Sequence, residues 1–177
     1  MFGKAKHPKA LLALFVFTVV AVVAVAVFET SGGPFVAATD PVAQINSDFY
    51  SHLQGLHSMN VTLIVQAYAT NATARYDVQG PRQPGTGNYT GTKNIENLFG
   101  GSIFQEFAVP NFTAMNSTVK VTGNTATLDS TFTMSGYNSA GNPQTAHVSA
   151  HDVYVRYSHD WLISYEVWTF TFPTVAG

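Results

Sequence analysis

The chain has 177 residues, of which 10% are charged and 46% are hydrophobic, and it contains no cysteine. The length fits one domain, and the lack of cysteine excludes disulfide scaffolds, thiolate metal sites and cysteine nucleophiles. After residue 9, five basic residues stand against ten acidic ones, so an electrostatic nucleic-acid-binding surface is also excluded.

The beginning of the chain predicts a membrane anchor. Residues 10–28 are apolar apart from Thr18, and a run of this length crosses a bilayer as one helix. Lysines precede the run, but none follows it closely. The positive-inside rule therefore places residues 1–9 in the cytoplasm and the rest of the chain outside the cell membrane. Residues 29–39, which contain a Gly-Gly-Pro sequence, are expected to be a linker.

Two other interpretations of the apolar run stay open. A cleaved signal peptide has an apolar core of about 7–15 residues followed by small residues, whereas this run is longer and is followed by Glu29. The sequence Lys9-Ala10-Leu11 resembles the processing site of an archaeal pilin, which implies a filament subunit. We favour a retained anchor because of the length of the run.

Five Asn-x-Ser/Thr sequons support the outward orientation of the remaining chain. They begin at Asn60, Asn71, Asn88, Asn111 and Asn116. Such sequons accept N-linked glycans on exported proteins. Glycans would hydrate a surface that is poor in charge, and they would indicate an archaeal or eukaryotic source. A strand surface rich in Thr and Asn is the competing explanation of the same residues.

The expected extracytoplasmic domain, residues 40–177, begins with a predicted helix at 41–57. Asp40 is a favoured N-cap residue, and Pro41 is favoured at the first helical position. Apolar residues then recur at helical spacing, namely Val42, Ile45, Phe49, Leu53 and Leu56. A second, shorter helix is predicted near 60–69, and its buried stripe is Val61, Ile64, Val65 and Tyr68.

A strand, a loop and a third helix follow. Residues 72–79 are predicted to be a strand, and 80–87 an open loop. The third helix is predicted from 93 to about 107, with Thr92 as its cap and a bend or break at Gly100-Gly101. Its expected buried residues are Ile95, Leu98, Phe99, Ile103 and Phe107.

From residue 111 onward the hydrophobic period changes from that of a helix to that of a strand. Segments rich in Thr, Val, Tyr, Phe and Trp predict strands at 119–121, 125–135, 145–157 and 161–172. Turns are expected at 123–124, 138–143 and 158–160. Short connections make consecutive strands antiparallel, and helices followed by strands indicate an α+β domain with its helices on one face of the sheet.

Two segments are distinctive within this order of elements. Residues 89–95 read Tyr-Thr-Gly-Thr-Lys-Asn-Ile before the third helix, and residues 161–168 read Trp-Leu-Ile-Ser-Tyr-Glu-Val-Trp in the last strand. Over about residues 40–173 the chain resembles the nuclear transport factor 2-like (NTF2-like) superfamily, which includes SnoaL-like proteins. The resemblance implies a cone of helices packed on a strongly bent antiparallel sheet, with a pocket at the open end. It does not imply one function, since this fold hosts isomerases, cyclases, hydrolases, scaffolds and association domains.

Asp152 is the first candidate for acid–base chemistry. Strand alternation places it on one face with Ala146, Val148 and Ala150. Burial among small apolar residues raises a carboxyl pKa toward the range of a general base. The competing interpretation is that Asp152 pairs with Arg156, two steps further along the same face, or with a backbone group. We favour this structural pairing because ion pairs often produce such patterns.

Glu166 lies in an apolar and aromatic stretch of the last strand. Its face is expected to carry Leu162, Ser164, Trp168, Phe170 and Phe172. One interpretation puts Glu166 in the pocket beside Asp152, as a second carboxylate for proton transfer. The other, which we favour, puts it at the rim of an aromatic surface that binds a partner. The candidate pocket or partner-binding residues are Tyr154, Tyr165, Trp168 and Phe170, and Tyr76 is a further candidate for the pocket lining.

The histidines do not indicate a metal site. His147 and His151 are four residues apart in a strand, which separates them by about 13 Å, too far for one ion. His52 and His57 are five residues apart in a helix and do not share a face. The sequence contains no phosphate loop, Ser-His-Asp arrangement or dinucleotide fingerprint. We therefore expect neither a metal nor a cofactor.

We expect a non-enzymatic function, that of an association or ligand-binding domain held outside the cell membrane. An accessory subunit of a membrane or cell-surface complex is one form of this role. Many aromatic strand residues and no recognisable catalytic set favour binding over reaction. The expected contacts are the membrane, a protein partner or second copy, and a small apolar ligand. The alternatives are a SnoaL-like extracytoplasmic enzyme with Asp152 or Glu166 as general base, and a pilin-like filament subunit.

Overall fold

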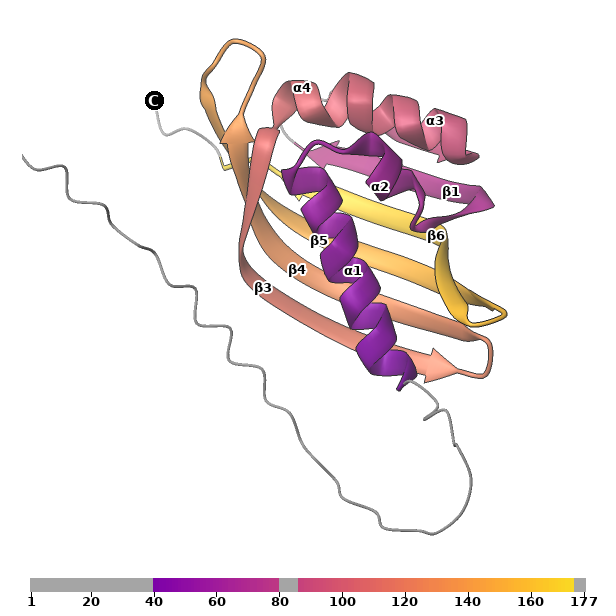
Figure 1. Cartoon of the computed structure of the whole chain (residues 1–177). Helices are drawn as coiled ribbons and strands as arrows, with labels where there is room; N and C mark the ends of the chain where they lie inside the picture. Colours follow the sequence, from indigo (N-terminus) through magenta and orange to yellow (C-terminus); the bar gives the residue numbers. More distant parts are fainter. Residues whose placement is uncertain (1–39, 80–85, 174–177) are drawn as a thin grey trace, which may run out of the picture. The chain divides into compact units, whose positions relative to one another are not determined.

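The computed structural model describes residues 40–79 and 86–173, which form a six-stranded sheet with helices on one of its faces (Figure 1). The expected cytoplasmic tail at 1–9, the apolar run at 10–28 and the linker at 29–39 lie outside the described residues. In the described part of the chain, no helix is both long enough and apolar enough to cross a membrane.

The first helix, α1 (Pro41–His57), has the bounds that the sequence predicts. The Asp40 Oδ1 atom accepts a hydrogen bond of 3.0 Å from the backbone N–H of Val42. The buried residues of its apolar stripe, each at most 4% exposed, are Ile45, Phe49, Leu53 and Leu56. Val42 is 38% exposed, so the buried stripe begins later than predicted.

The second helix is shorter than predicted, and the first strand is longer. Asn60 caps helix α2 (Val61–Val65) through its side chain. Strand β1 (Tyr68–Gln79) begins at Tyr68 instead of residue 72. The reason is tertiary pairing: the Ala67 carbonyl accepts a hydrogen bond of 2.8 Å from the backbone of Ile163 in the last strand. This pairing takes Tyr68 out of the predicted helix.

The predicted third helix is present as three joined segments, which are α3 (Thr92–Asn97), the π-helix η1 (Leu98–Ile103) and α4 (Phe104–Glu106). The glycine pair at 100–101 lies within η1, so the expected irregularity is a π-helix. The predicted cap is wrong by one residue, because the N-cap is Gly91. Its φ of 83° is a backbone conformation that glycine adopts without strain.

The remaining strands are β2 (Gly87–Thr90), β3 (Ala108–Thr122), β4 (Thr125–Tyr137), β5 (Pro143–Tyr157) and β6 (Asp160–Thr171). The turns between β3 and β6 fall where the sequence predicts them. Strand β2 is not predicted, and β3 begins well before residue 119. Val109 and Ala114 have left-handed backbone conformations, and register shifts lie beside them. Such bulges interrupt the alternation of buried and exposed side chains. The first part of β3 therefore lacks the sequence pattern of a strand.

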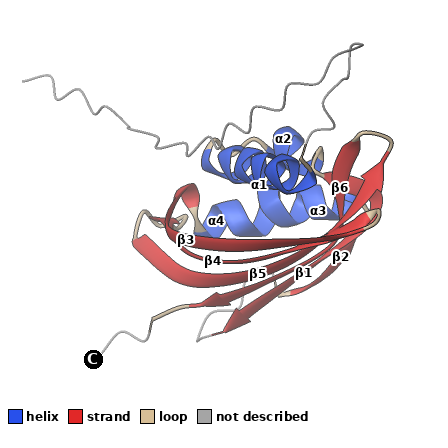
Figure 2. Cartoon of the chain, turned by 90° about the horizontal axis from the view of Figure 1, so that it is seen from below, coloured by secondary structure: helices blue, strands red, loops and turns tan. Residues whose placement is uncertain are grey.

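The strand order is β2-β1-β6-β5-β4-β3. All neighbours are antiparallel except β1 and β6, which are parallel. The expected purely antiparallel sheet is therefore wrong, and the sheet is mixed. The chain between β1 and β6 includes the helices from α3 to α4, which gives it the length that a parallel return needs. Figure 2 shows the helices covering one face of a curved sheet.

Candidate functional site

Two carboxylic acids face the helix-covered side of the sheet from neighbouring central strands. Asp152 of β5 is directly opposite Glu166 of β6 in the register of the two strands. The two residues are 1% and 0% exposed. Directly opposite side chains on one face of an antiparallel pair have Cβ atoms about 4.5–5.5 Å apart. The fold therefore brings together the two acids that the sequence singles out.

Glu166 accepts hydrogen bonds from two tyrosines of β1. Tyr68 donates a hydrogen bond to Oε2, and Tyr76 donates one of 3.3 Å to Oε1 of the same carboxyl group. The indole N–H of Trp168 donates a hydrogen bond of 3.3 Å to Oδ1 of Asp152. All five residues are at most 4% exposed, and we call them the acid cluster: Asp152, Glu166, Tyr68, Tyr76 and Trp168.

Burial raises the pKa of both carboxyl groups in the acid cluster. For Asp152, burial raises the pKa to about 7, the hydrogen bond from Trp168 opposes this shift, and the charge of Asp129 adds to it. For Glu166, burial and then the charge of Asp152 raise the pKa well above its usual value. Both carboxyl groups therefore keep their protons to a higher pH than an exposed carboxyl group does. Such a pair is able to take up and release a proton.

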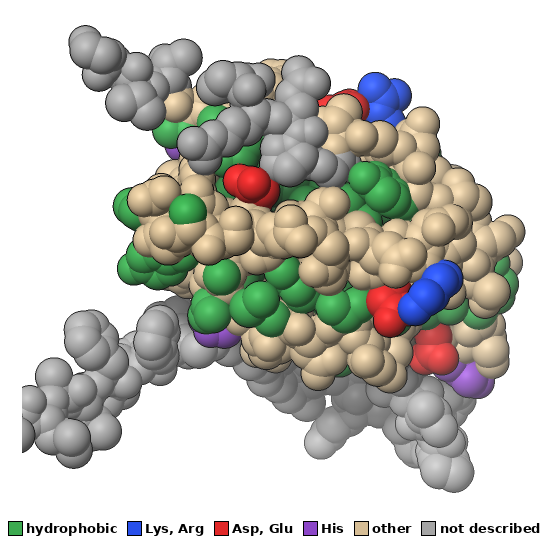
Figure 3. All heavy atoms as spheres, turned by 90° about the horizontal axis from the view of Figure 1, so that it is seen from above, with side chains coloured by type: hydrophobic (Ala, Val, Ile, Leu, Met, Phe, Trp, Pro, Cys, Tyr) green, Lys and Arg blue, Asp and Glu red, His purple; other side chains and the backbone are tan. Residues whose placement is uncertain are grey.

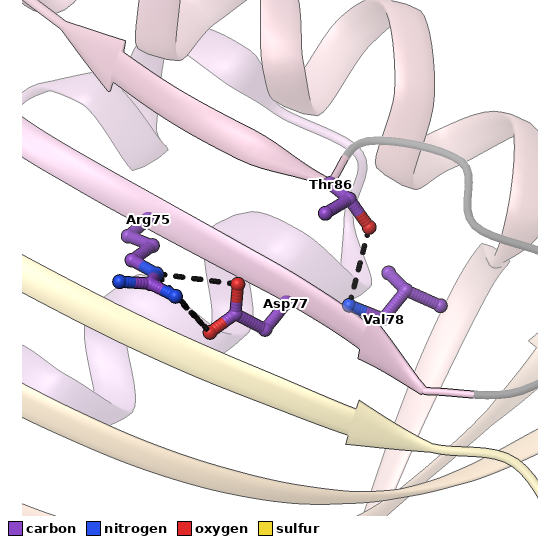
Figure 4. A network of polar contacts seen from close by, with 4 residues as sticks. All are labelled: Arg75, Asp77, Val78 and Thr86. Atoms are coloured by element: carbon purple, nitrogen blue, oxygen red, sulfur yellow. Dashed lines mark hydrogen bonds and ion pairs between the residues drawn. The ribbon is translucent and has the colours of Figure 1, made fainter.

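Charged pairs on the described surface lie apart from the acid cluster. Arg75 and Asp77 flank Tyr76 on β1 and point away from the core, with a nitrogen and an oxygen 3.1 Å apart (Figure 4). Lys93 and Glu96 pair at 2.8 Å on α3. Figure 3 shows a face made mostly of uncharged side chains, where the basic groups lie beside acidic ones. Among the described residues, no basic side chain forms an ion pair with the acid cluster.

The favoured pairing of Asp152 with Arg156 is wrong. Asp152 accepts its hydrogen bond from Trp168, and the Arg156 guanidinium carbon lies 6.0 Å from the ring centre of Trp161. Two steps along one face of a strand separate the two residues by about 13 Å. The arginine therefore lies beyond the buried part of β5, too far along the strand to pair with Asp152.

The favoured placement of Glu166 at an exposed aromatic rim is also wrong. The register between β5 and β6 shifts near the middle of the strands. On one side of the shift Trp161 and Ile163 are buried, and on the other side Glu166, Trp168 and Phe170 are buried. An extra residue in a strand moves the following side chains to the opposite face. An uninterrupted alternation therefore assigns the wrong neighbours to Glu166.

The other predicted pocket or partner-binding residues divide between the core and the surface. Tyr154 is 1% exposed, and its hydroxyl group has no hydrogen-bond partner among the described residues. Trp168 and Phe170 are also buried. Tyr165 is 38% exposed. It pairs with Val153 of β5. Most of the aromatic residues expected to bind a partner are therefore core residues.

His52 is a further residue of the candidate site, and its position in the sequence gives no sign of this. It is 1% exposed, and neither ring nitrogen has a hydrogen bond of ordinary geometry to a described residue. Burial lowers its pKa to about 4, although the nearby backbone of Ile64 acts in the opposite direction. The imidazole is therefore neutral at physiological pH. Its ring lies edge-on to Tyr68 and Trp168, with ring centres 5.6 and 5.9 Å apart.

A depression of about 280 Å³ reaches His52 from the surface, and we call it the α1–β6 hollow. Its walls come from α1, α2 and the start of β6, and they include Asp48, His52, Leu63, Asp160 and Trp161. His52 thus lines the hollow and also contacts two aromatic rings of the acid cluster. The imidazole ring of His52 thus connects the hollow with the buried cluster through these contacts.

The strand histidines lie on the exposed side of the sheet. His151 Nδ1 is 2.6 Å from Asp129 Oδ1, and His147 Nδ1 is 3.3 Å from the hydroxyl oxygen of Thr133. The described residues contain no group of three or more His, Asp or Glu that is placed to hold a metal ion. These histidines therefore form separate surface contacts.

The five sequon asparagines are all exposed in the structure. They lie at the cap of α2, on β1, on β2 and on the edge strand β3, at Asn60, Asn71, Asn88, Asn111 and Asn116. An exposed side chain is a requirement for a glycan. Their occupancy stays a prediction.

No protein-family model and no curated protein matches this chain. Solved structures match its fold. One is a putative calcium/calmodulin dependent protein kinase II association domain from Xanthomonas campestris, with a TM-score of 0.63. The two sequences are 17% identical, and the match covers 84% of this chain and 100% of the other.

Two further matches come from chains described as enzymes. A putative dehydratase from the NTF2-like family of Streptomyces avermitilis has a TM-score of 0.60 and 15% identity, over 76% of this chain and 97% of the other. The chain has the NTF2-like α+β fold. A hexachlorocyclohexane dehydrochlorinase, LinA-type3 from Novosphingobium barchaimii, matches with a TM-score of 0.61 and 17% identity, over 77% of this chain and 90% of the other. At these identities the matches show a shared fold and do not assign a function.

The two tyrosines of β1 differ in how far the sequence predicts their positions. Tyr76 is a candidate for the pocket lining in a predicted strand, and the structure places it in the buried acid cluster. Tyr68 was assigned to a helix, since its spacing from Ile64 also fits a helical stripe. The register of β1 against β6 shifts between Tyr68 and Thr73, so simple alternation does not link Tyr68 with Tyr76. Pairing with the distant strand β6 places both tyrosines.

Proposed function

We propose that residues 40–173 form a ligand-binding domain and that the acid cluster is the part of its interior that acts on the ligand. The observation that carries this proposal is the pair of fully buried carboxyl groups, Asp152 and Glu166, opposite each other. Burial of ionisable groups costs stability. Clusters of perturbed pKa values occur preferentially at functional sites. The α1–β6 hollow, which ends at His52, supplies a route from the surface.

We assign this domain to the outside of the cell membrane on the basis of the sequence. Residues 10–28 serve as the anchor, residues 1–9 as the cytoplasmic tail and residues 29–39 as the linker. N-linked glycans on the exposed sequon asparagines would hydrate a surface with few charges. The pilin-like alternative depends on processing near residue 10, which lies outside the described residues.

The ligand-binding form of the role has more support than the association form. Association with a protein partner or a second copy, including the role of an accessory subunit, was inferred from aromatic residues. Trp168 and Phe170 are buried, so they are not available on the surface of the folded domain. The same burial places Trp168 against Asp152, where it supports an interior site.

A second candidate is proton transfer by a SnoaL-like extracytoplasmic enzyme. The observation that favours it is the difference between the surroundings of the two acids: Asp152 accepts a hydrogen bond from Trp168, and Glu166 accepts hydrogen bonds from two tyrosines. Asp152, with a pKa raised to about 7, suits a general base near neutral pH. Glu166, whose pKa is raised by burial and by the charge of Asp152, is proposed as the partner acid that holds a proton and donates a hydrogen bond. This step uses residues of the chain and no cofactor.

A ligand screen tests the proposed function. Small organic molecules that raise the Tm of the full chain in detergent would be titrated against Asp152→Asn and Asp77→Asn. Asp152→Asn keeps an oxygen that accepts the hydrogen bond from Trp168 but does not ionise. Asp77→Asn removes an equal charge from the exposed side of β1. We expect ligands to bind Asp152→Asn at least about tenfold more weakly than the wild type and to bind Asp77→Asn unchanged.

The outcomes separate the two candidates. Equal binding to all three proteins would show that the acid cluster does not meet the ligand. Binding without turnover supports a binding domain. Turnover that disappears in Asp152→Asn supports the enzymatic candidate.

A further inference from the structure

The α1–β6 hollow has chemistry that indicates a class of ligand. We propose that it binds a small organic cation, an ammonium group on an apolar body, with Asp48 as the charge partner and His52 as a hydrogen-bond acceptor. This inference deepens the proposed function and rests on it, because the hollow ends at the histidine that contacts the acid cluster.

The charge of the hollow is negative. Asp48 of α1 and Asp160 of β6 line it, and its lining includes no Lys or Arg. Burial raises the pKa of Asp48, and the charge of Asp160 raises it further, so the two carboxyl groups repel each other. The guanidinium of Arg156 contacts the ring of Trp161 at 6.0 Å and does not line the hollow. An ammonium group would relieve the repulsion and form charge-assisted hydrogen bonds.

His52 supplies an independent sign of a ligand. Its side chain is 1% exposed, yet neither ring nitrogen has a hydrogen bond of ordinary geometry to a described residue. The backbone of Ile64 acts as a weak partner of the ring, which leaves at least one nitrogen unpaired among the described residues. Buried polar atoms are normally paired, and an unpaired one calls for a partner that completes it. A neutral imidazole has one nitrogen with a free lone pair. That nitrogen is able to accept a hydrogen bond from an N–H group bound in the hollow.

The other walls suit an apolar body. Leu63, Trp161 and Leu162 line the hollow beside the acids. Its volume of about 280 Å³ is near the lower end of ligand pockets, about 300 Å³, which fits a small amine. The described residues do not place three or more His, Asp or Glu side chains to hold a metal ion. An organic cation therefore fits the hollow better than a metal ion.

The test compares two probes of the same shape. Benzylamine is protonated at pH 7.5, whereas benzyl alcohol is neutral. Each would be titrated by calorimetry into the full chain in detergent, against a micelle-only blank. We expect benzylamine to bind the wild type at least about tenfold more tightly than benzyl alcohol, which is the scale of a hydrogen bond to a charged group.

Three variants locate the binding. We expect Asp48→Asn to remove the preference for benzylamine and His52→Phe, which keeps the carboxylates, to weaken benzylamine several-fold. Asp77→Asn is the charge-matched control and should bind as the wild type does, with the Tm of each variant verifying that it is folded.

Equal binding of the two probes to the wild type, no binding of benzylamine at millimolar concentration, or wild-type binding by Asp48→Asn would each overturn the inference. Asp152→Asn distinguishes it from the proposed function. Benzylamine binding that survives Asp152→Asn but not Asp48→Asn would establish the hollow and leave the acid cluster without a role in binding.

Discussion

The pKa of Asp152 is set by its surroundings more than by a single partner. Burial raises this pKa, while the hydrogen bond from Trp168 favours the ionised form. The hydrogen bonds from Tyr68 and Tyr76 and the nearby indole N–H of Trp168 favour the ionised form of Glu166, yet burial and the charge of Asp152 outweigh them. At the scale of single residues, one site therefore holds two acids whose pKa values are both raised by burial.

Asp152→Asn tests this balance through stability. The folded-state pKa of about 7 lies above the ordinary value of 3.8, so the folded protein keeps a proton that the unfolded chain releases. The free energy of unfolding therefore falls as the pH rises from about 4 to about 7. We expect the part of this fall due to Asp152 to be on the order of 4 kcal/mol and to be absent from the variant.

Urea unfolding of both proteins at several pH values measures this difference. The contribution of His52 is present in both proteins and cancels when they are compared. The charge of Asp152 also raises the pKa of Glu166, so the difference between the two proteins reports the coupled acid pair. The variant should be more stable than the wild type at pH 8. An identical pH dependence in the two proteins would show that Asp152 ionises normally in the folded state.

At the scale of elements, local signals were sufficient where local interactions decide the structure. Helix α1 follows from its Asp40-Pro41 start and its apolar stripe, and the hairpins from β3 to β6 follow from their turns. The start of β1 depends on β6, and the alternation in β3 and β6 is interrupted by irregular residues. Alternation along β5 is regular up to Asp152, so the sequence predicts the burial of this residue. The irregularity in β6 precedes Glu166, so simple alternation assigns Glu166 to the wrong face.

Gly136 tests the contact between the end of β4 and the start of β3. A Cβ atom at Gly136 would lie 2.9 Å from the carbonyl oxygen of Ala108, whereas one at Gly101 in η1 would meet nothing within 4 Å. We expect Gly136→Ala to lower the free energy of unfolding by about 1–3 kcal/mol. Gly101→Ala should leave it unchanged or raise it by up to about 1 kcal/mol.

Thermal denaturation of the two glycine variants gives the comparison. Both changes add the same methyl group. The difference between their shifts in Tm therefore reports mainly how closely the surroundings of each glycine are packed. Equal shifts in Tm would mean that β3 does not approach Gly136 as closely as described.

At the scale of the whole molecule, the sequence predicted the class of fold but not the full sheet. Helices in the first half and strands in the second were enough to predict an α+β domain with one covered face. The parallel pairing of β1 with β6 joins segments that are distant in sequence and has no local signal. That pairing also carries Tyr68 and Tyr76 to Glu166, so the complete acid cluster is visible only in the folded chain.

Orientation and glycosylation are also properties of the whole molecule. We expect protein extracted from native membranes to lose mass on removal of N-linked glycans, because its sequon asparagines are exposed and the domain is proposed to lie outside. Protease added to intact cells should also cleave residues 40–177. Intact-mass measurement and immunoblotting read these outcomes. An unmodified mass together with full protection from the protease would argue against the proposed orientation.

The most direct measurement is a carbon-13 NMR titration of the Asp and Glu side-chain carboxyl groups in the full chain, with Asp152→Asn and Glu166→Gln to assign the signals. We predict that Asp152 titrates near pH 7, and that Glu166 titrates well above its usual range. The loss of either acid should shift the titration of the other, because neighbouring acids are coupled. Titration of both groups near pH 4, without any coupling, would contradict a buried acid pair poised for proton exchange.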